Sequence, residues 1–324
     1  MEQRQPLKVA SLFSGCGGLC YAFHKSPDFE VVYANDFDAD ACATYERNLG
    51  LKPQCCDIAT VETIPDCDVI LSGCPCQGAS LANPARCEED PRNGLYLQMV
   101  RLIELKQPKF FVFENVRGMM SLGGYETKAD KKAQRGRVLK KIISDFEHAG
   151  YVPHCHLFKM VEYGVPQTRE RVIILGVRKD LGYDVKMPPP LTTPPRTLTD
   201  AIGDLGHEED PSTQHVGSKC KVRRTGYVGE RDLYWDKPSP TLLGRGSRTG
   251  GPNAHIHPDY KRRMTIREYA RIQTFPDDFV LDGTICSMYR QLGNAVPPVF
   301  SEVLKDLVSA LEFSSNLPAA GGVL

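Results

Sequence analysis

Two side chains that could act in catalysis follow short apolar segments of this 324-residue chain. One segment runs into a turn that carries Cys76, and a second segment ends at Glu114. Most cysteines are small core residues. Here, however, Pro75 fixes the backbone before Cys76 and the polar segment 79–93 follows, a setting in which an exposed thiolate can react. A thiol nucleophile and a carboxyl acid at the ends of two buried strands indicate one active site at the rim of a sheet, with Cys74 as a structural thiol.

A glycine-rich turn and a later acid indicate that the chain also binds an adenosine-containing cofactor. The turn, residues 13–18, has the sequence Phe-Ser-Gly-Cys-Gly-Gly and lacks the third glycine of the G-x-G-x-x-G pattern. Asp36, about twenty residues later, would accept hydrogen bonds from ribose hydroxyls. Phe37 would stack on an adenine, and Asp57 would accept from a base amino group. The incomplete pattern argues against a bound pyrophosphate; a structural glycine turn with an unrelated acid is the alternative.

Strand-like and helix-like segments alternate through the first half of the chain. We expect strands at 8–13, 30–34, 69–71, 110–113 and 171–177, and helices at 19–25, 38–49, 95–105 and 137–150. This alternation predicts an α/β fold with a mostly parallel sheet and helices on both of its faces. Ligands of such sheets bind beyond the carboxyl ends of the strands, which is where the glycine turn, Cys76 and Glu114 fall.

The alternation ends at a proline-rich segment, residues 187–195. From there to about Met264 the chain is rich in Gly, Arg, Ser and Thr, which predicts a small, irregular domain. Eleven Lys/Arg against four Asp/Glu between Gly217 and Arg263 give this part a net charge of +7, although the whole chain balances 40 basic with 40 acidic residues. Helices are expected again at 265–273 and 299–311.

Composition excludes several classes of protein. The chain has no apolar run long enough to cross a bilayer and no apolar signal segment at its N-terminus, so we expect an intracellular protein. Its twelve cysteines lack the paired CxxC or His-x₃-His spacing of a zinc site. We therefore expect reduced thiols and no metal.

Five ordered motifs resemble those of the C5-cytosine DNA methyltransferases. They are Gly-Cys-Pro-Cys-Gln at 73–77, Glu-Asn-Val at 114–116, Gln-Thr-Arg-Glu-Arg at 167–171, Arg-Glu-Tyr-Ala-Arg-Ile-Gln-Thr-Phe-Pro at 267–276 and Gln-Leu-Gly-Asn-Ala-Val-Pro at 291–297. The resemblance extends from about Val9 to Leu311. It implies a Rossmann-like class I methyltransferase with a catalytic domain at 1–190, completed by 276–315. A small target-recognition domain would occupy 191–275 and a flexible tail 316–324.

The resemblance also implies a reaction, in which a methyl group passes from S-adenosylmethionine to C5 of cytosine in double-stranded DNA and leaves S-adenosylhomocysteine. Because C5 is a poor nucleophile, the Cys76 thiolate would first add to C6 of a flipped-out cytosine. Glu114 would hold and protonate N3, and should be partly desolvated. Arg169 and Arg171 would brace Glu114 and grip the cytosine and its phosphate.

The other contacts carried over from the family concern the cofactor and the DNA. Cofactor contacts fall on Phe13, Gly15, Gly18, Leu19, Asp36, Phe37, Asp57, Ile58, Pro75, Leu95, Asn294 and Val296. Asp36 is shorter by one methylene than the family's frequent glutamate and Phe37 replaces a frequent tryptophan, but neither change threatens activity. DNA contacts fall on Gln77, Ser80, Arg86, Arg92, Thr241, Arg245 and Arg248, with residues 80–93 as the closing loop.

Partners and alternatives follow from the same resemblance. It implies a monomer that binds double-stranded DNA and no membrane, nuclear in a eukaryote, or cytoplasmic beside a restriction endonuclease in a bacterium. A tRNA cytosine-5 methyltransferase and a non-catalytic DNA-binding relative are the alternatives. The first has Pro-Pro-Cys-Gln where this chain has Cys-Pro-Cys-Gln, and its Cys-Phe-Thr signature is absent here. The four intact catalytic positions argue against the second.

Overall fold

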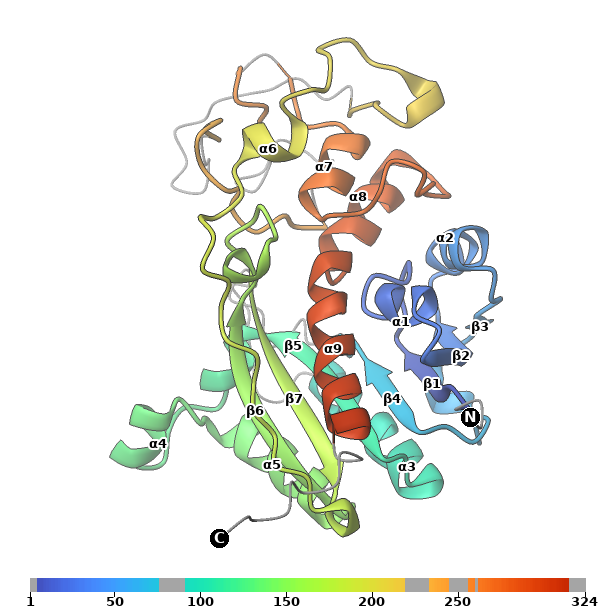
Figure 1. Cartoon of the computed structure of the whole chain (residues 1–324), viewed down its shortest axis with the longest axis vertical. Helices are drawn as coiled ribbons and strands as arrows, with labels where there is room; N and C mark the ends of the chain where they lie inside the picture. The colour runs from blue at the N-terminus through green and yellow to red at the C-terminus, as the bar shows by residue number, and fades with distance from the viewer. Residues whose placement is uncertain (1–4, 76–90, 219–232, 245–255, 260–261, 315–324) are drawn as a thin grey trace, which may run out of the picture.

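A seven-stranded sheet forms the centre of the described structure (Figure 1). The computed structural model describes residues 5–75, 91–218, 233–244, 256–259 and 262–314, with Pro91, Arg92 and Ser314 described by their backbone alone. The strands are β1 (Leu7–Leu12), β2 (Phe29–Asp36), β3 (Gln54–Cys55), β4 (Val69–Ser72), β5 (Phe110–Val116), β6 (Tyr151–Lys159) and β7 (Glu170–Arg178). Their order across the sheet is β3-β2-β1-β4-β5-β7-β6.

The first five strands are parallel and the last two are antiparallel to their neighbours. The predicted α/β fold with a mostly parallel sheet is therefore confirmed. Strand β6 was not predicted, because it lies at the sheet edge and contains polar, partly exposed residues such as His154 and His156. Strand β5 is longer than predicted: its pairing with β7 continues from Phe110 to Val116, so that Glu114 lies inside the strand and not after it.

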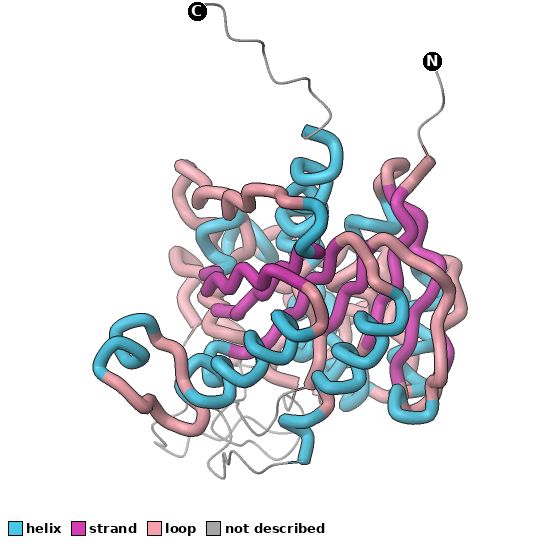
Figure 2. The backbone as a smooth tube through the Cα atoms, turned by 90° about the horizontal axis from the view of Figure 1, so that it is seen from below, coloured by secondary structure: helices cyan, strands magenta, loops and turns pink. Residues whose placement is uncertain are grey.

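Helices cover both faces of the sheet (Figure 2). The described helices are α1 (Tyr21–Lys25), α2 (Ala39–Leu49), α3 (Tyr96–Lys106), α4 (Lys128–Ala133), α5 (Arg137–His148), α6 (Leu198–Ile202), α7 (Ile266–Ile272), α8 (Ile285–Asn294) and α9 (Pro298–Ser314). Those expected from the sequence are present with shifted ends, whereas α6 and α8 were not predicted. Among the described residues, no helix is both long and apolar enough to span a bilayer.

Successive residues of the central strands enter two different hydrophobic cores, because side chains alternate between the faces of a sheet. Val9 and Phe110 belong to a first core with α1, α2 and α9. Ala10 and Phe111 belong to a second core with α3 and α5. Burial on both faces explains why these strands are almost uninterrupted apolar runs in the sequence.

The last helix, α9, lies across one face of the sheet beside α1 (Figure 1). Two hydrogen bonds join them: the Ser301 hydroxyl donates to the Leu19 carbonyl at 2.6 Å and accepts from the Ala22 amide at 3.2 Å. The C-terminal part of the chain therefore supports the same sheet edge as the N-terminal turn.

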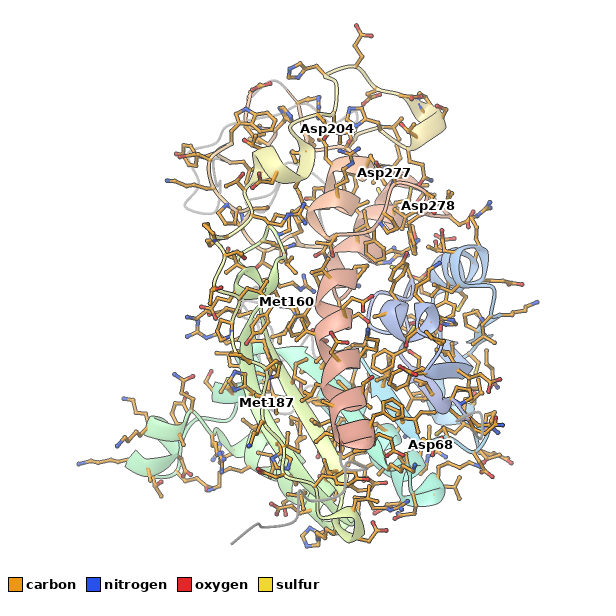
Figure 3. The ribbon with its side chains drawn as sticks, viewed as in Figure 1. Asp68, Met160, Met187, Asp204, Asp277 and Asp278 are labelled. Carbon is orange, nitrogen blue, oxygen red and sulfur yellow. The ribbon has the colours of Figure 1, made fainter. Side chains whose placement is uncertain are left out.

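A third hydrophobic core lies beyond that edge and is built by α6, α7 and α8. Arg271 at the end of α7 fixes two loops to this core by binding Asp277 at 2.7 Å and Asp204 at 2.5 Å; both acids lie beside α7 (Figure 3). The third core contains residues on both sides of the expected domain boundary at 275/276, such as Tyr269 and Tyr289. The division into domains stays a prediction.

Candidate active site

The glycine turn after β1 and the acid after β2 are joined directly. Phe13, Gly15 and Gly17 all have positive φ angles, of 52°, 53° and 97°, so the chain turns sharply as it leaves the strand. The Gly15 amide donates to Asp36 Oδ2 at 2.8 Å, and the Asp38 amide donates to Asp36 Oδ1 at 2.9 Å. Burial raises the pKa of the Asp36 carboxyl. Its position is therefore fixed by the backbone of the turn that it faces.

Two more of the expected cofactor residues are exposed next to this turn. The Phe37 ring is 71% exposed, which is unusual for a large apolar side chain. Asp57 follows β3 and caps the short 3₁₀ helix Ile58–Thr60, where its Oδ1 accepts from the Ala59 amide at 2.9 Å. The carboxyl ends of three neighbouring strands thus present a turn, an aromatic face and two carboxylates along one edge.

The remaining expected cofactor residues surround the same edge, though several are buried. Leu19, Ile58 and Val296 are packed in or against the cores, and Leu95 is half-buried at the start of α3. A Cβ added to Gly18 would lie 2.2 Å from the Val296 carbonyl oxygen. The absence of a side chain at position 18 therefore lets the N-terminal turn touch the segment that carries Asn294, which is exposed, and Val296.

The carboxylate expected to act in catalysis is buried against an arginine. Glu114 is 7% exposed, and its Oε1 lies 2.7 Å from Arg171 Nε. Register pairs Glu114 of β5 with Ile173 of β7, so the two side chains come from adjacent strands. Burial lowers the pKa of the Arg171 guanidinium, while the charge of Glu114 acts in the opposite direction. The partial desolvation expected for Glu114 is present.

The second arginine of the motif lies deeper and has different partners. Arg169 is 1% exposed, and its Nη1 donates to the carbonyls of Gly293 at 3.1 Å and Leu242 at 3.4 Å. Its Nε is buried and has no hydrogen-bond partner among the residues that the structure describes. Burial and, second, the charge of Arg171 hold the pKa of Arg169 well below its usual range. Arg169 therefore joins the entry of β7 to residues 239–242 (Ser-Pro-Thr-Leu, the Thr-Leu segment) and to α8.

The described part of the Cys-Pro-Cys turn is attached to β5. Asn115 Nδ2 donates to the Cys74 carbonyl at 3.2 Å, and Cys74 itself is buried in the second core, as predicted for a structural cysteine. Gly73 lies with its bare Cα beside Glu114, where an added Cβ would be 4.0 Å from Oε2. Pro75 is the last described residue before the expected nucleophile. Cys76 lies outside the described residues.

Most of the expected DNA contacts also lie outside the described residues, namely Gln77, Ser80, Arg86, Arg245 and Arg248 together with the side chain of Arg92. Thr241 is described. It is partly buried, and its hydroxyl donates to the Thr168 carbonyl at 3.4 Å. Further hydrogen bonds at 2.8 and 2.9 Å connect Ser239 with Thr168 and Pro166. The Thr-Leu segment is therefore attached to the entry of β7.

Two buried glutamines that sequence reasoning left without a role organise this junction. Gln167 Nε2 donates to Gln273 Oε1 at 2.8 Å, and Gln167 Oε1 accepts from the Leu242 amide at 2.9 Å. Gln273 Nε2 in turn donates to the carbonyls of Leu292 and Ala295. Both glutamines stand in quoted motifs, and a fully buried amide needs partners on both of its ends. The sequence therefore contains both glutamines within its motifs, but it does not identify the residues to which they are hydrogen-bonded.

The strand order of the sheet and the glycine turn after β1 together define a Rossmann-like methyltransferase fold. Glu114 and the two arginines form a cluster at the carboxyl edge of its sheet. The family model of C-5 cytosine-specific DNA methylases matches residues 7–309. The chain belongs to this family and is a DNA cytosine-5 methyltransferase.

Curated relatives and a solved structure agree with this assignment. A Type II methyltransferase of Neisseria gonorrhoeae is 36% identical, with 90% of this chain and 83% of the relative covered. One of Bacillus subtilis is 35% identical, with 96% and 82% covered. The crystal structure of a prophage-encoded DNA modification methyltransferase of E. coli, 24% identical, superposes with a TM-score of 0.70 over 94% of this chain and 99% of that one, and so shares the fold.

Proposed function

We propose that the chain transfers a methyl group from S-adenosylmethionine to C5 of a flipped-out cytosine in double-stranded DNA, through a covalent bond between Cys76 and C6. The observation that carries the proposal is the buried contact of 2.7 Å between Glu114 and Arg171. It joins an acid and a cation from adjacent strands at the edge where the glycine turn and the Cys-Pro-Cys turn also end.

The steps balance as follows. The Cys76 thiolate adds to C6 while N3 gains a proton, held there by Glu114, and the resulting enamine has a nucleophilic C5. S-adenosylmethionine supplies the electrophilic methyl group that C5 takes. The methyl transfer releases S-adenosylhomocysteine; loss of the C5 proton to a base then restores the double bond and expels the thiolate, and N3 returns its proton to Glu114. Each step needs the cytosine outside the helix, because C6 is not accessible within stacked bases.

Glu114 is suited to the N3 contact because Arg171 Nε lies against its Oε1, on one side of the carboxylate. Oε2 faces the bare Cα of Gly73, so the space beside it is not filled by a side chain of that residue. Arg171 acts as a positioning residue that fixes the carboxylate by a charge-assisted contact. Arg169, which is almost fully buried, supports the same strand through two carbonyls and not through the substrate.

The edge beside β1 and β2 fits the cofactor. Asp36 is held by two backbone amides and keeps further lone pairs for ribose hydroxyls. The exposed Phe37 ring offers a face for an adenine, and Asp57 offers a carboxylate oxygen beyond the one that caps its own helix. Gly18 allows the close approach of the 294–296 segment, which would line the methionine end.

DNA binding is assigned to the predicted recognition domain, residues 191–275, acting in a monomer. Its support is the net charge of +7 between Gly217 and Arg263, since Lys and Arg dominate contacts with phosphates. The Type II names of the relatives favour a restriction endonuclease with the same target as a further partner.

The test is incubation of the protein with methyl-labelled S-adenosylmethionine and either unmodified duplex DNA or tRNA. Label in DNA is the expected result, whereas label in tRNA alone would show that the substrate is wrong. Duplexes containing 5-fluorocytosine test the covalent step, because fluorine at C5 cannot leave as a proton and the adduct should persist in denaturing gels. Cys76→Ser should form no adduct but still bind the cofactor; an adduct in this variant would exclude Cys76 as the nucleophile.

A further inference from the structure

Three side chains near α6 and α7 lie close together, and methyl transfer gives them no role. His207, His257 and Asp259 each present one ligand atom, and the three atoms all lie within 4.8 Å of one another. Asp259 Oδ2 is 3.3 Å from His207 Nδ1 and 3.6 Å from His257 Nδ1. The residues come from the loop after α6 and from the segment before α7, which are far apart in the sequence.

The spacing corresponds better to ligands around an ion than to direct hydrogen bonds. Imidazole–carboxylate hydrogen bonds have distances of about 2.7–3.2 Å, so a separation of 3.6 Å is too long for one. Tetrahedral ligands at about 2.0–2.1 Å from Zn²⁺ are separated by about 3.4 Å. The two measured separations lie on either side of that value.

The lone pairs of the buried histidine and of the aspartate point in the required direction. His257 Nδ1 accepts a weak hydrogen bond from the Asp259 amide at 3.3 Å, so Nδ1 is the unprotonated nitrogen, and an ion bound there would replace the amide at its one lone pair. His257 Nε2 lies 3.6 Å from the carboxylate of Glu268. The Trp235 indole donates to Asp259 Oδ1 at 3.2 Å, which leaves Oδ2 for the ion.

A carboxylate behind a metal-bound histidine is a common outer support, because it fixes the ring and its tautomer. Glu268 has this place and is itself fixed. Its side chain is 1% exposed, both of its oxygens bind Arg262 at 2.6 and 2.8 Å, and Oε2 also accepts from the Thr265 amide at 2.7 Å. Glu268 thus places a fixed negative charge 3.6 Å from His257 Nε2, a distance too long for a direct hydrogen bond.

The exposed ligand is also held in place, through its neighbours in the chain. His215, which is buried, lies with Nε2 2.9 Å from the Gly206 carbonyl, immediately before His207. Two residues after His207, Glu209 Oε1 accepts from the Gly217 amide at 3.0 Å. The loop therefore presents His207 from two fixed points, although the side chain of His207 is 72% exposed.

We propose that His207, His257 and Asp259 bind one Zn²⁺ ion, with water in the fourth position. Two imidazoles favour Zn²⁺ over Mg²⁺ or Ca²⁺, which prefer ligand sets made of oxygen. The ion joins the loop after α6 to the segment before α7 and so stabilises this region. Cysteine and histidine spacing in the sequence does not detect the site, because its ligands meet only in the folded chain.

The test uses Co²⁺ as a probe on full-length protein freed of metal with a chelator. One equivalent should give the visible absorption of tetrahedral Co²⁺ with nitrogen and oxygen ligands, and Zn²⁺ should abolish it. His207→Asn is the decisive variant, because an exposed side chain can be replaced without loss of the fold. It should weaken Zn²⁺ binding at least tenfold, as should Asp259→Asn. His156→Asn, an exposed histidine on β6, is the matched control and should bind as the wild type does.

Thermal unfolding gives a second readout that does not depend on methyl transfer. Zn²⁺ should raise the Tm of the wild type and of His156→Asn, and raise that of His207→Asn by less at the same Zn²⁺ concentration, because the stabilisation follows the affinity for the native state. Equal Zn²⁺ affinity in His207→Asn and wild type would overturn the proposal. So would Co²⁺ spectra dominated by thiolate bands, since the site would then consist of cysteines.

Discussion

Replacing Arg171 by glutamine should destabilise the protein strongly, because it leaves the Glu114 carboxylate buried without its cation. Glu114 is 7% exposed, and Arg171 Nε lies 2.7 Å from its Oε1. Removing one partner of a buried ion pair costs about 3–5 kcal/mol, mainly because the remaining charge is desolvated and unpaired. That is a large part of the ~5–15 kcal/mol by which domains are stable.

The matching prediction concerns the double variant. In Glu114→Gln/Arg171→Gln both charges of the pair are absent, so neither leaves the other buried and unpaired, and the two amides can bond to each other. The loss of unfolding free energy should therefore be smaller than the sum of the two single losses, by about 1–3 kcal/mol. If Arg171→Gln alone does not accumulate as folded protein, recovery of folded protein in the double variant would show the same coupling between the two positions.

Urea denaturation of the wild type, the two single variants and the double variant at neutral pH measures this coupling. Arg117→Gln is the matched control, because Arg117 forms an ion pair of the same 2.7 Å length with Glu170 but is half exposed. It should lose at most about 1 kcal/mol. Additive losses in the cycle, or an equal loss in Arg117→Gln, would refute the argument that burial makes the Glu114–Arg171 pair important. All variants at position 114 should also lose methyl transfer while keeping cofactor binding.

Three further changes test other parts of the structure. Gly293→Ala should lose about 1–3 kcal/mol of stability, because the added Cβ would lie 2.1 Å from the Gly244 amide nitrogen; Gly206→Ala, which meets nothing within 4 Å, is the control and a similar loss there would contradict the explanation. Asp36→Asn should weaken S-adenosylmethionine binding about tenfold by calorimetry, since charge-assisted hydrogen bonds are lost; unchanged affinity would remove Asp36 from the site. Burial lowers the pKa of His24 to about 4. Because the unfolded chain binds the proton at higher pH, the free energy of unfolding should fall by up to about 3 kcal/mol as the pH is lowered from about 6.5 to about 4. His24→Gln should flatten this pH dependence in denaturation curves.

Sequence patterns located the central strands within a few residues because these strands are buried on both faces. Strand β6 was missed for the opposite reason: at the sheet edge, polar residues such as His154 and Cys155 interrupt the apolar pattern. Helix α8 was missed because Gly293 weakens its helical pattern, although that glycine is what allows the contact with Gly244. A local sequence pattern cannot show that a residue is required by a close contact with a residue far away in the chain.

The candidate site divides in a similar way. The motifs that contain Glu114 and Arg171 lie on adjacent strands, β5 and β7, and Arg169 directly precedes β7. The sequence could not show that Arg169 is almost fully buried, because arginines are usually exposed and its partners are carbonyl oxygens of distant segments. Nor could it show the His207–His257–Asp259 cluster, whose members are brought together by α6 and α7.

The two arginines of the motif at 167–171 have different contacts, which indicates that they have different roles. Arg169 directly precedes β7, and Arg171 is the second residue of that strand. Arg171 contacts the carboxylate expected to act on N3. Among the described residues, the hydrogen bonds of Arg169 go to the carbonyls of Leu242 and Gly293, which belong to the Thr-Leu segment and to the closing motif.

Three motifs that are separate in the sequence are therefore one hydrogen-bonded unit. Gln167 and Gln273 extend that unit to α7 and to the Ala295 carbonyl, next to the segment that touches Gly18. A buried network in which every amide is used has few alternative arrangements. We therefore propose that the closing motifs act on catalysis indirectly: they hold the entry of β7, and β7 carries the Arg171 that lies against Glu114.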